Sequence, residues 1–168
     1  KKNIAESEKV GIADLMKQNN LSTFEAKGTA KPSEEFKKYS VFSFGANFTE
    51  VWVDKDTGMY RIKRMVNVGS AGKILNPKTA YGQIIGGLTM GAGMVLAERT
   101  QVEPNYGNFI TRTLADYHVP VNLDLANIDV IFLPEEDKIA NEMGVKGIGE
   151  LGITSVAASI ANAIFNAT

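Results

Sequence analysis

One stretch of helical character contains five glycines, and this constrains the fold more than any other feature. It begins at Asn76-Pro77, where Asn is a good helix cap and Pro a good first helical residue, and runs to Ala97 or Glu98. Each glycine costs an exposed helix about 1 kcal/mol relative to alanine. Close approach of another backbone or a ligand is the usual reason for such glycines. We therefore predict a tightly packed helix, with its glycines at positions 82, 86, 87, 91 and 93.

The segments around this helix predict strands and a second helix. Residues 39–54 alternate apolar and polar, a tight turn at 55–58 follows, and residues 59–68 return as the second strand of a hairpin. Residues 128–133 predict a buried strand, and residues 151–167 a helix with one apolar face. Together these elements predict an α+β fold, a two-layer sandwich with helices packed on a mostly antiparallel sheet.

The first predicted strand carries a row of aromatic side chains on one face. We expect this row to form sheet core rather than to line a substrate site, and its members are Phe42, Phe44, Phe48 and Trp52.

The N-terminal part, residues 1–38, is organised differently from residues 39–168, and we predict a boundary between them. Residues 4–18 show a partial apolar stripe that indicates a helix, and residues 22–30 read as a short strand or an extended arm. The chain begins without Met and ends within an apolar helical pattern. We therefore expect it to be a segment of a longer protein.

Composition excludes several classes of function. Lys and Arg number 18 against 19 Asp and Glu, so the chain lacks the basic excess of a nucleic-acid-binding protein. It has no Cys, which excludes disulfides and iron–sulfur ligation, and its one His, His118, is expected at the surface. No residue is assigned as a metal ligand, and the acidic run 135–137 is expected to be a solvated loop. The longest apolar run, 84–97, is too short to span a membrane, so no membrane partner is expected.

Residues 144–152 are rich in glycine and contain G-x-G-x-x-G as Gly147, Gly149 and Gly152. We reject a dinucleotide-binding loop because ten mostly polar residues separate the motif from the preceding strand, and because the sequence ends before the position where the acidic ribose-binding residue is expected. Glu150 would also place a carboxylate where the phosphate must lie. The residues alone leave two readings of Glu150 open. It is either a functional carboxylate mounted on a glycine turn or a helix N-terminal acid that stabilises the helix dipole by roughly 0.3–1 kcal/mol.

Four blocks of the chain resemble, in order and spacing, the molybdopterin-binding large subunit of the xanthine dehydrogenase and aldehyde oxidase family. They are FSFGANFTEV at 42–51, NVGSAGKILNP at 67–77, the glycine-rich segment 83–98, and GVKGIGE at 144–150 with the apolar run 156–164. The Leu151-Gly152-Ile153 that follows Glu150 is most similar to the bacterial aldehyde-oxidising branch. The resemblance covers residues 39–168.

The resemblance implies a specific chemistry. The Glu matching Glu150 would be the general base that takes the proton from a molybdenum-bound hydroxide, which attacks the carbon of an aldehyde or N-heterocycle. An apolar, glycine-lined pocket would raise the pKa of such a carboxylate. The cofactor would be a molybdenum–molybdopterin, in its cytosine dinucleotide form. Residues expected to contact it are Gly45, Ala46, Asn47, Gln83, Gly147 and Gly149.

The resemblance also implies partners. These are the remaining domains of the large subunit, and FAD and iron–sulfur clusters carried on other domains or subunits, in either the cytoplasm or the periplasm of a bacterium. From the residues alone, Gln83 also fits a plain amide on the helix surface. A non-catalytic α+β domain that binds a small molecule or a protein remains the alternative, and molybdenum content of the full-length protein would distinguish the two.

Overall fold

The computed structural model describes residues 10–29, 31 and 34–168, and the chain divides into two compact units, residues 1–31 and 32–168. The first unit contains helix α1 (Ile12–Gln18). The predicted helix over 4–18 is thus confirmed only in its second half, and its residues 4–9 lie outside the described part. Residues 22–30 were predicted as a short strand or an extended arm, and of these two the strand does not form in the described residues 22–29. The boundary between residues 38 and 39 stays a prediction.

The second unit begins with a short 3₁₀ turn, η2 (Glu34–Lys37), and is built on a three-stranded sheet of order β1-β2-β5. Strand β1 (Phe44–Val53) pairs antiparallel with β2 (Tyr60–Ser70), and Gly58 closes the hairpin with a φ of +72° that favours glycine. Strand β5 (Ile128–Phe132) joins β2 in parallel, so the sheet is mixed. The predicted α+β class is confirmed.

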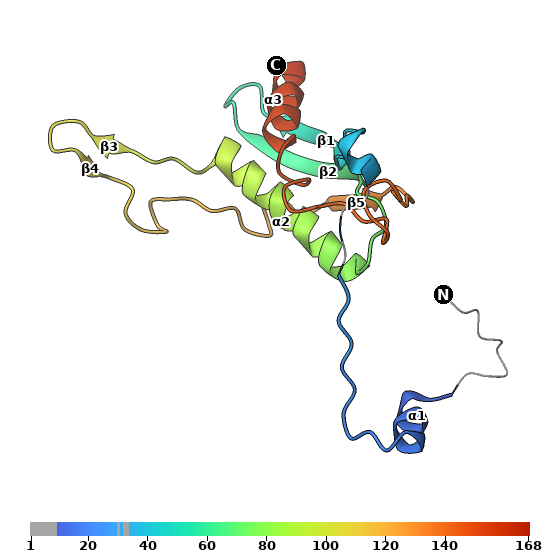
Figure 1. Ribbon diagram of the computed structural model, residues 1–168. Coiled ribbons are helices and arrows are strands. Elements are labelled where there is room, and N and C mark those ends of the chain that lie inside the picture. The colour runs from blue at the N-terminus through green and yellow to red at the C-terminus, as the bar shows by residue number, and fades with distance from the viewer. Residues whose placement is uncertain (1–9, 30, 32–33) are drawn as a thin grey trace. The chain divides into compact units, whose positions relative to one another are not determined.

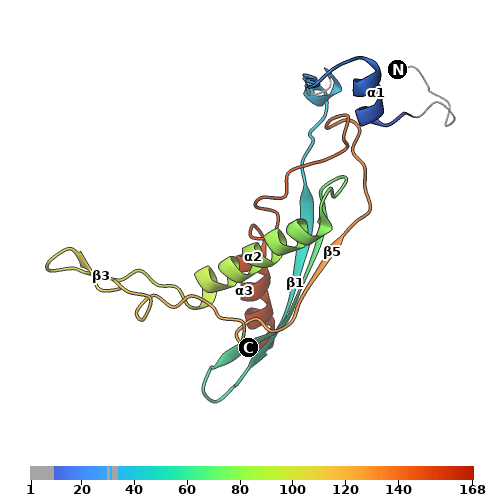
Figure 2. The same ribbon diagram turned by 90° about the horizontal axis from the view of Figure 1, so that it is seen from below.

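Two helices pack together on one face of this sheet (Figures 1 and 2). Helix α2 (Pro77–Leu96) begins as predicted, because the Asn76 side chain accepts hydrogen bonds from the backbone N–H groups of Lys78 and Thr79. Helix α3 (Val156–Ala167) begins five residues later than predicted, after turns over 151–155. The core between helices and sheet consists of Met65, Ile84, Leu88, Ala92, Leu125, Val156 and Ile160.

Three of the α2 glycines lie where the chain itself approaches closely. A Cβ at Gly87 would lie 3.0 Å from the backbone N of Ile153, and one at Gly91 would lie 2.7 Å from Cβ of Val156. Gly93 lies against Pro120 in the same way. The predicted close packing is therefore confirmed at these three positions, whereas a Cβ at Gly82 or Gly86 would meet no described atom within 4 Å.

The aromatic row of β1 shares one face, as expected, but it is the face that the helices do not cover. Phe44, Phe48 and Trp52 are 62%, 61% and 57% exposed, and Phe42, which precedes the strand, is 74% exposed. The prediction of sheet core is therefore wrong. The other face of β1 points to the helices, because α3 packs on that side. It carries Asn47, Thr49 and Val51.

Between α2 and β5 the chain makes a long excursion. Its hairpin of β3 (Val102–Glu103) and β4 (Asn108–Phe109) stands away from the sheet in both views (Figures 1 and 2). Further along the excursion, residues 114–116 form a turn. Within the described residues, no helix combines the length and apolar character that a membrane crossing needs.

Candidate functional site

The glycine-rich loop before α3 lies where β1 begins and β2 ends, and it is held at both of its own ends. On one side, Lys146 donates its backbone N–H to the carbonyl of Ala71 over 2.9 Å, and Gly72 pairs with Val145. On the other side, the Leu151 side chain fills space above two sheet glycines. A Cβ at Gly69 would lie 3.0 Å from it and one at Gly45 3.4 Å from it. Residues 147–150 therefore form a short bridge held at both ends.

Two side chains from elsewhere in the fold hold this bridge. Gln83, in the first half of α2, donates from Nε2 to the carbonyl oxygen of Gly149 over 2.7 Å. The hydroxyl of Ser43, just before β1, donates to the carbonyl oxygen of Gly147. The fold thus brings together three of the predicted site residues, Gln83, Gly147 and Gly149, next to Glu150.

The bridge presents a carboxylate and unpaired backbone donors. Glu150 is exposed, so the described residues do not enclose it in the apolar pocket that we expected. The backbone N–H groups of residues 147–150 have no acceptor within the part of the chain that the structure describes. A Cβ at Gly147 or Gly149 would meet no described atom within 4 Å. Consecutive free N–H groups beside open space suit a ligand rich in oxygen acceptors.

The strand residues of the predicted site lie on both faces of β1. Asn47 points to the helices, where its Nδ2 donates to Oγ of Ser155 over 2.6 Å and its Oδ1 accepts from Asn67 over 2.6 Å. Gly45 shares that face and lies under Leu151, whereas Ala46 is exposed on the opposite face. The structure therefore brings Gly45 close to the bridge but separates Ala46 from Asn47.

A half-buried ion cluster that sequence reasoning missed lies beside the bridge. The Lys146 side chain is only 6% exposed, and its Nζ lies 2.8 Å from Oε1 of Glu135 and 3.5 Å from Oδ2 of Asp137. The second carboxylate oxygen of Glu135 accepts from the Ser70 hydroxyl and from the N–H of Gly72. The prediction of a solvated acidic loop is therefore wrong for Glu135 and Asp137.

The electrostatics of this cluster follow from its contacts. The hydrogen bond from Lys146, followed by that from Ser70, holds the pKa of Glu135 below its ordinary value. The signal available in the sequence was Lys146 itself, a lone cation in an otherwise glycine-rich and apolar segment. Its acidic partners lie about ten positions earlier, and only the folded chain brings them together.

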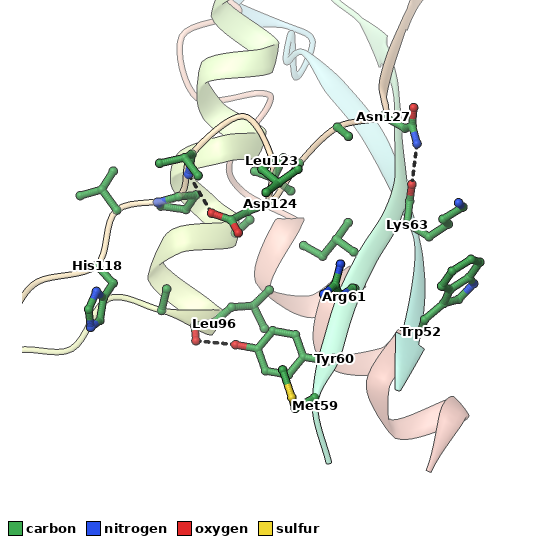
Figure 3. Close-up of a pocket in the computed structure, with 18 residues that line it drawn as sticks. Trp52, Met59, Tyr60, Arg61, Lys63, Leu96, His118, Leu123, Asp124 and Asn127 are labelled. Atoms are coloured by element: carbon green, nitrogen blue, oxygen red, sulfur yellow. Dashed lines mark hydrogen bonds between the residues drawn. The ribbon is translucent and has the colours of Figure 1, made fainter. Parts of the chain in front are cut away.

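A cavity of about 700 Å³ lies at the other end of α2 (Figure 3). It lies between Leu96, the start of β2 and the segment 118–127, and Tyr60 donates its hydroxyl to the Leu96 carbonyl at its edge. His118 lines it as an exposed loop residue, in agreement with its expected surface position. None of the predicted site residues lines this cavity, so it is separate from the Glu150 bridge.

Comparison with known families identifies the chain. The family model described as a molybdopterin cofactor-binding domain matches residues 2–126. The chain belongs to the molybdopterin-binding domain of molybdenum hydroxylase large subunits. The resemblance stated from the sequence is confirmed.

Individual relatives agree with this family. The aldehyde oxidoreductase molybdenum-binding subunit PaoC of Escherichia coli K12 is 46% identical over 83% of this chain and 20% of its own length. The nicotine 6-hydroxylase large subunit of Paenarthrobacter nicotinovorans is 32% identical over 97% of this chain, which includes position 150, and 20% of its own length. The molybdopterin-binding chain therefore spans about a fifth of these relatives.

A solved structure shows the same fold. The aldehyde oxidoreductase from Desulfovibrio desulfuricans superposes with a TM-score of 0.64 at 30% identity, over 74% of this chain and 13% of that one. The residues at the bridge fit a molybdopterin. Its pterin and phosphate groups offer many hydrogen-bond acceptors, and residues 147–150 offer free N–H donors beside glycines with open space.

Proposed function

We propose that this chain is part of a molybdenum hydroxylase that oxidises aldehydes or N-heterocycles with water as the oxygen source, and that Glu150 is its general base. The observation that supports this most is the bridge 147–150, which presents one carboxylate among free N–H groups at a position fixed by Gln83 and Ser43. A helix-capping Glu needs no such support from distant parts of the chain.

In this proposal the bridge binds the cofactor through its backbone. The N–H groups of Gly147 and Gly149 donate to the acceptors of a molybdopterin, in its cytosine dinucleotide form. Gln83 donates one N–H to the carbonyl oxygen of Gly149. Its Oε1 accepts no hydrogen bond from the described residues, so this oxygen can accept one from the cofactor. Gly45 and Asn47 act indirectly, because Gly45 leaves room for Leu151 and Asn47 holds the start of α3. Ala46, on the exposed face of β1, contacts the cofactor.

When bound, the molybdenum–molybdopterin supplies oxygen transfer to the substrate and accepts two electrons. For an aldehyde the balance is RCHO + H₂O → RCOOH + 2 H⁺ + 2 e⁻. Glu150 accepts the proton of the water-derived nucleophile as the new C–O bond forms, and general bases of this kind commonly contribute about 10²–10⁴-fold to the rate. The electrons leave through iron–sulfur clusters and FAD on partner domains or subunits.

The substrate class is tested on the full-length enzyme purified with its partner subunits. Reduction of the enzyme by aromatic aldehydes, aliphatic aldehydes and N-heterocycles is measured under anaerobic conditions, with molybdenum per large subunit measured on the same samples. The proposal expects stoichiometric molybdenum and reduction by at least one of these classes. A molybdenum-replete enzyme that none of them reduces would contradict it.

A further inference from the structure

The bridge that carries Glu150 contains two glycines that make few stabilising contacts of their own. Gly147 and Gly149 have no side chain to pack, and their N–H groups have no acceptor among the described residues. Glycine carries the largest backbone entropy of any residue, so such a segment is mobile unless its ends are fixed. The position of the Glu150 carboxylate therefore depends on the hydrogen bonds from Gln83 and Ser43 within the bridge and on what anchors its start at Lys146.

The anchor on the Lys146 side is electrostatic. Its ammonium group lies between Glu135 and Asp137, with its side chain 6% exposed, and Glu135 ties the group to the end of β2 through Ser70 and Gly72. Lys146 is four residues from Glu150 in the same segment. Charge-assisted contacts of this kind are shorter and stronger than neutral hydrogen bonds, so they limit how far the start of the bridge can move.

We propose that Lys146 is a positioning residue for Glu150. Its half-buried ion pairs with Glu135 and Asp137 hold the start of the bridge against the end of β2, and thereby hold the Glu150 carboxylate where it takes the proton. This inference rests on the proposed function, because it assigns Lys146 a role through Glu150. Lys146 itself does not touch the reacting atoms.

Replacement of Lys146 by Met keeps the aliphatic stem and removes the charge. It leaves two carboxylates without their cation, and the start of the bridge loses its anchor. Because misplacement of a catalytic group by about 1 Å can cost 10²-fold, we expect kcat of the cofactor-loaded enzyme to fall by about 10²-fold in Lys146→Met, with KM changed much less. A purely structural lysine would lower the amount of folded enzyme and leave kcat per molybdenum unchanged.

Hydrogen exchange supplies a readout that does not depend on turnover. The backbone N–H of Lys73 donates to Gly144 over 2.7 Å, and that of Lys146 donates to Ala71 over 2.9 Å. Both amides lie at the anchored start of the bridge. We expect their deuterium uptake to rise in Lys146→Met, whereas amides in the middle of α2 exchange as in the wild type.

Lys138→Met is the matched control. Lys138 lies beside Asp137 in the same acidic loop, its side chain is exposed, and it has no ion-pair partner among the described residues. It removes one positive charge without touching the cluster, so kcat and exchange should match the wild type. Where Lys146→Met does not fold, Glu135→Gln replaces it, since this change leaves the Lys146–Asp137 pair in place and should show the same two effects in weaker form.

The outcomes separate this inference from the proposed function. Wild-type kcat per molybdenum and unchanged exchange at Lys73 and Lys146 would overturn the positioning role, and so would loss of kcat to the same degree in Lys138→Met. Glu150→Gln is measured in the same series. If that variant keeps its rate, the proposed function fails, and the exchange data still report whether Lys146 holds the bridge.

Discussion

Gln83 of α2 donates a hydrogen bond of 2.7 Å to the carbonyl of Gly149, across 66 positions of sequence. This bond connects the glycine-rich helix directly to the residue before Glu150. It gives Gln83 a structural task beside the cofactor contact that we propose for it.

Gln83→Leu should therefore lower both cofactor retention and rate. The substitution keeps the size of the side chain but removes the bond to Gly149 and the free Oε1. We expect less molybdenum per subunit and a lower kcat per molybdenum, with a loss of only about 0.5–1.5 kcal/mol in stability for one hydrogen bond. Metal analysis and steady-state kinetics measure both. Lys78→Met, an exposed change in the first turn of α2, should alter neither, and equal effects in the two variants would contradict the assignment.

Alanine substitutions at Gly149 and Gly152 compare a glycine beside open space with a glycine packed against the chain. Neither Gly149 nor Gly152 has a positive φ, so alanine fits the backbone at both. At Gly149 the added methyl group meets no described atom within 4 Å, so the fold should keep its stability within about 0.5 kcal/mol while cofactor retention falls.

At Gly152 the methyl group would lie 2.8 Å from the Ile84 carbonyl oxygen, and this overpacking should cost about 1–3 kcal/mol. Melting temperatures of the full-length apo subunit and molybdenum content after reconstitution give the comparison. Normal molybdenum loading in Gly149→Ala would remove the bridge backbone from the cofactor site.

Acid should weaken the chain through Glu135. Because the contacts with Lys146 and Ser70 lower its folded-state pKa, its contribution to stability is complete above the unfolded value of 4.5. The contribution is lost as pH falls from 4.5 through the lower pKa of the folded state. Over this range the carboxylate is protonated in the unfolded state before it is protonated in the folded state, so acid favours unfolding. Urea unfolding of the 168-residue chain between about pH 3 and about pH 6 should show this loss, and Glu135→Gln should flatten the slope. Parallel slopes in the two proteins would argue against the linkage.

The exposed aromatic row predicts association of the isolated chain. Phe44, Phe48 and Trp52 expose three large aromatic side chains on one face of β1, interrupted by the exposed Glu50, and exposed apolar groups of this size promote self-association. Sedimentation of the 168-residue chain should show oligomers that decrease in Phe44→Thr/Phe48→Thr, where threonine keeps the β-propensity. A monomer at high concentration in the unchanged chain would refute this.

Local patterns predicted much of the fold because local chemistry determines those elements. Asn76-Pro77 starts α2, and Gly58 closes the hairpin, since a cap and a turn need only their own residues. The alternation of β1 placed its aromatic side chains on one face correctly. It could not reveal which face α3 covers, because that depends on packing between distant segments.

The candidate site divides in the same way. Glu150 and its glycines are visible as a motif within the sequence, and the motif supports the family. The contacts that fix it, Gln83 with Gly149 and Lys146 with Glu135, join residues far apart in the chain or in an irregular loop. A hydrophobic pattern along the sequence cannot indicate such pairs, so the acidic run was predicted to be solvated. The same pattern placed the start of α3 five residues too early.

The role of Glu150 as general base is tested most directly by Glu150→Gln in the full-length, cofactor-loaded enzyme. The amide is nearly isosteric and cannot accept the proton, so folding and molybdenum content should stay near normal. The rate of enzyme reduction by substrate should fall by about 10²–10⁴-fold. A capping role would instead lower stability by roughly 0.3–1 kcal/mol and leave that rate almost unchanged. Measured on one preparation, a stable, molybdenum-replete Glu150→Gln enzyme with a strongly reduced rate supports the account, and the same enzyme with near wild-type rate contradicts it.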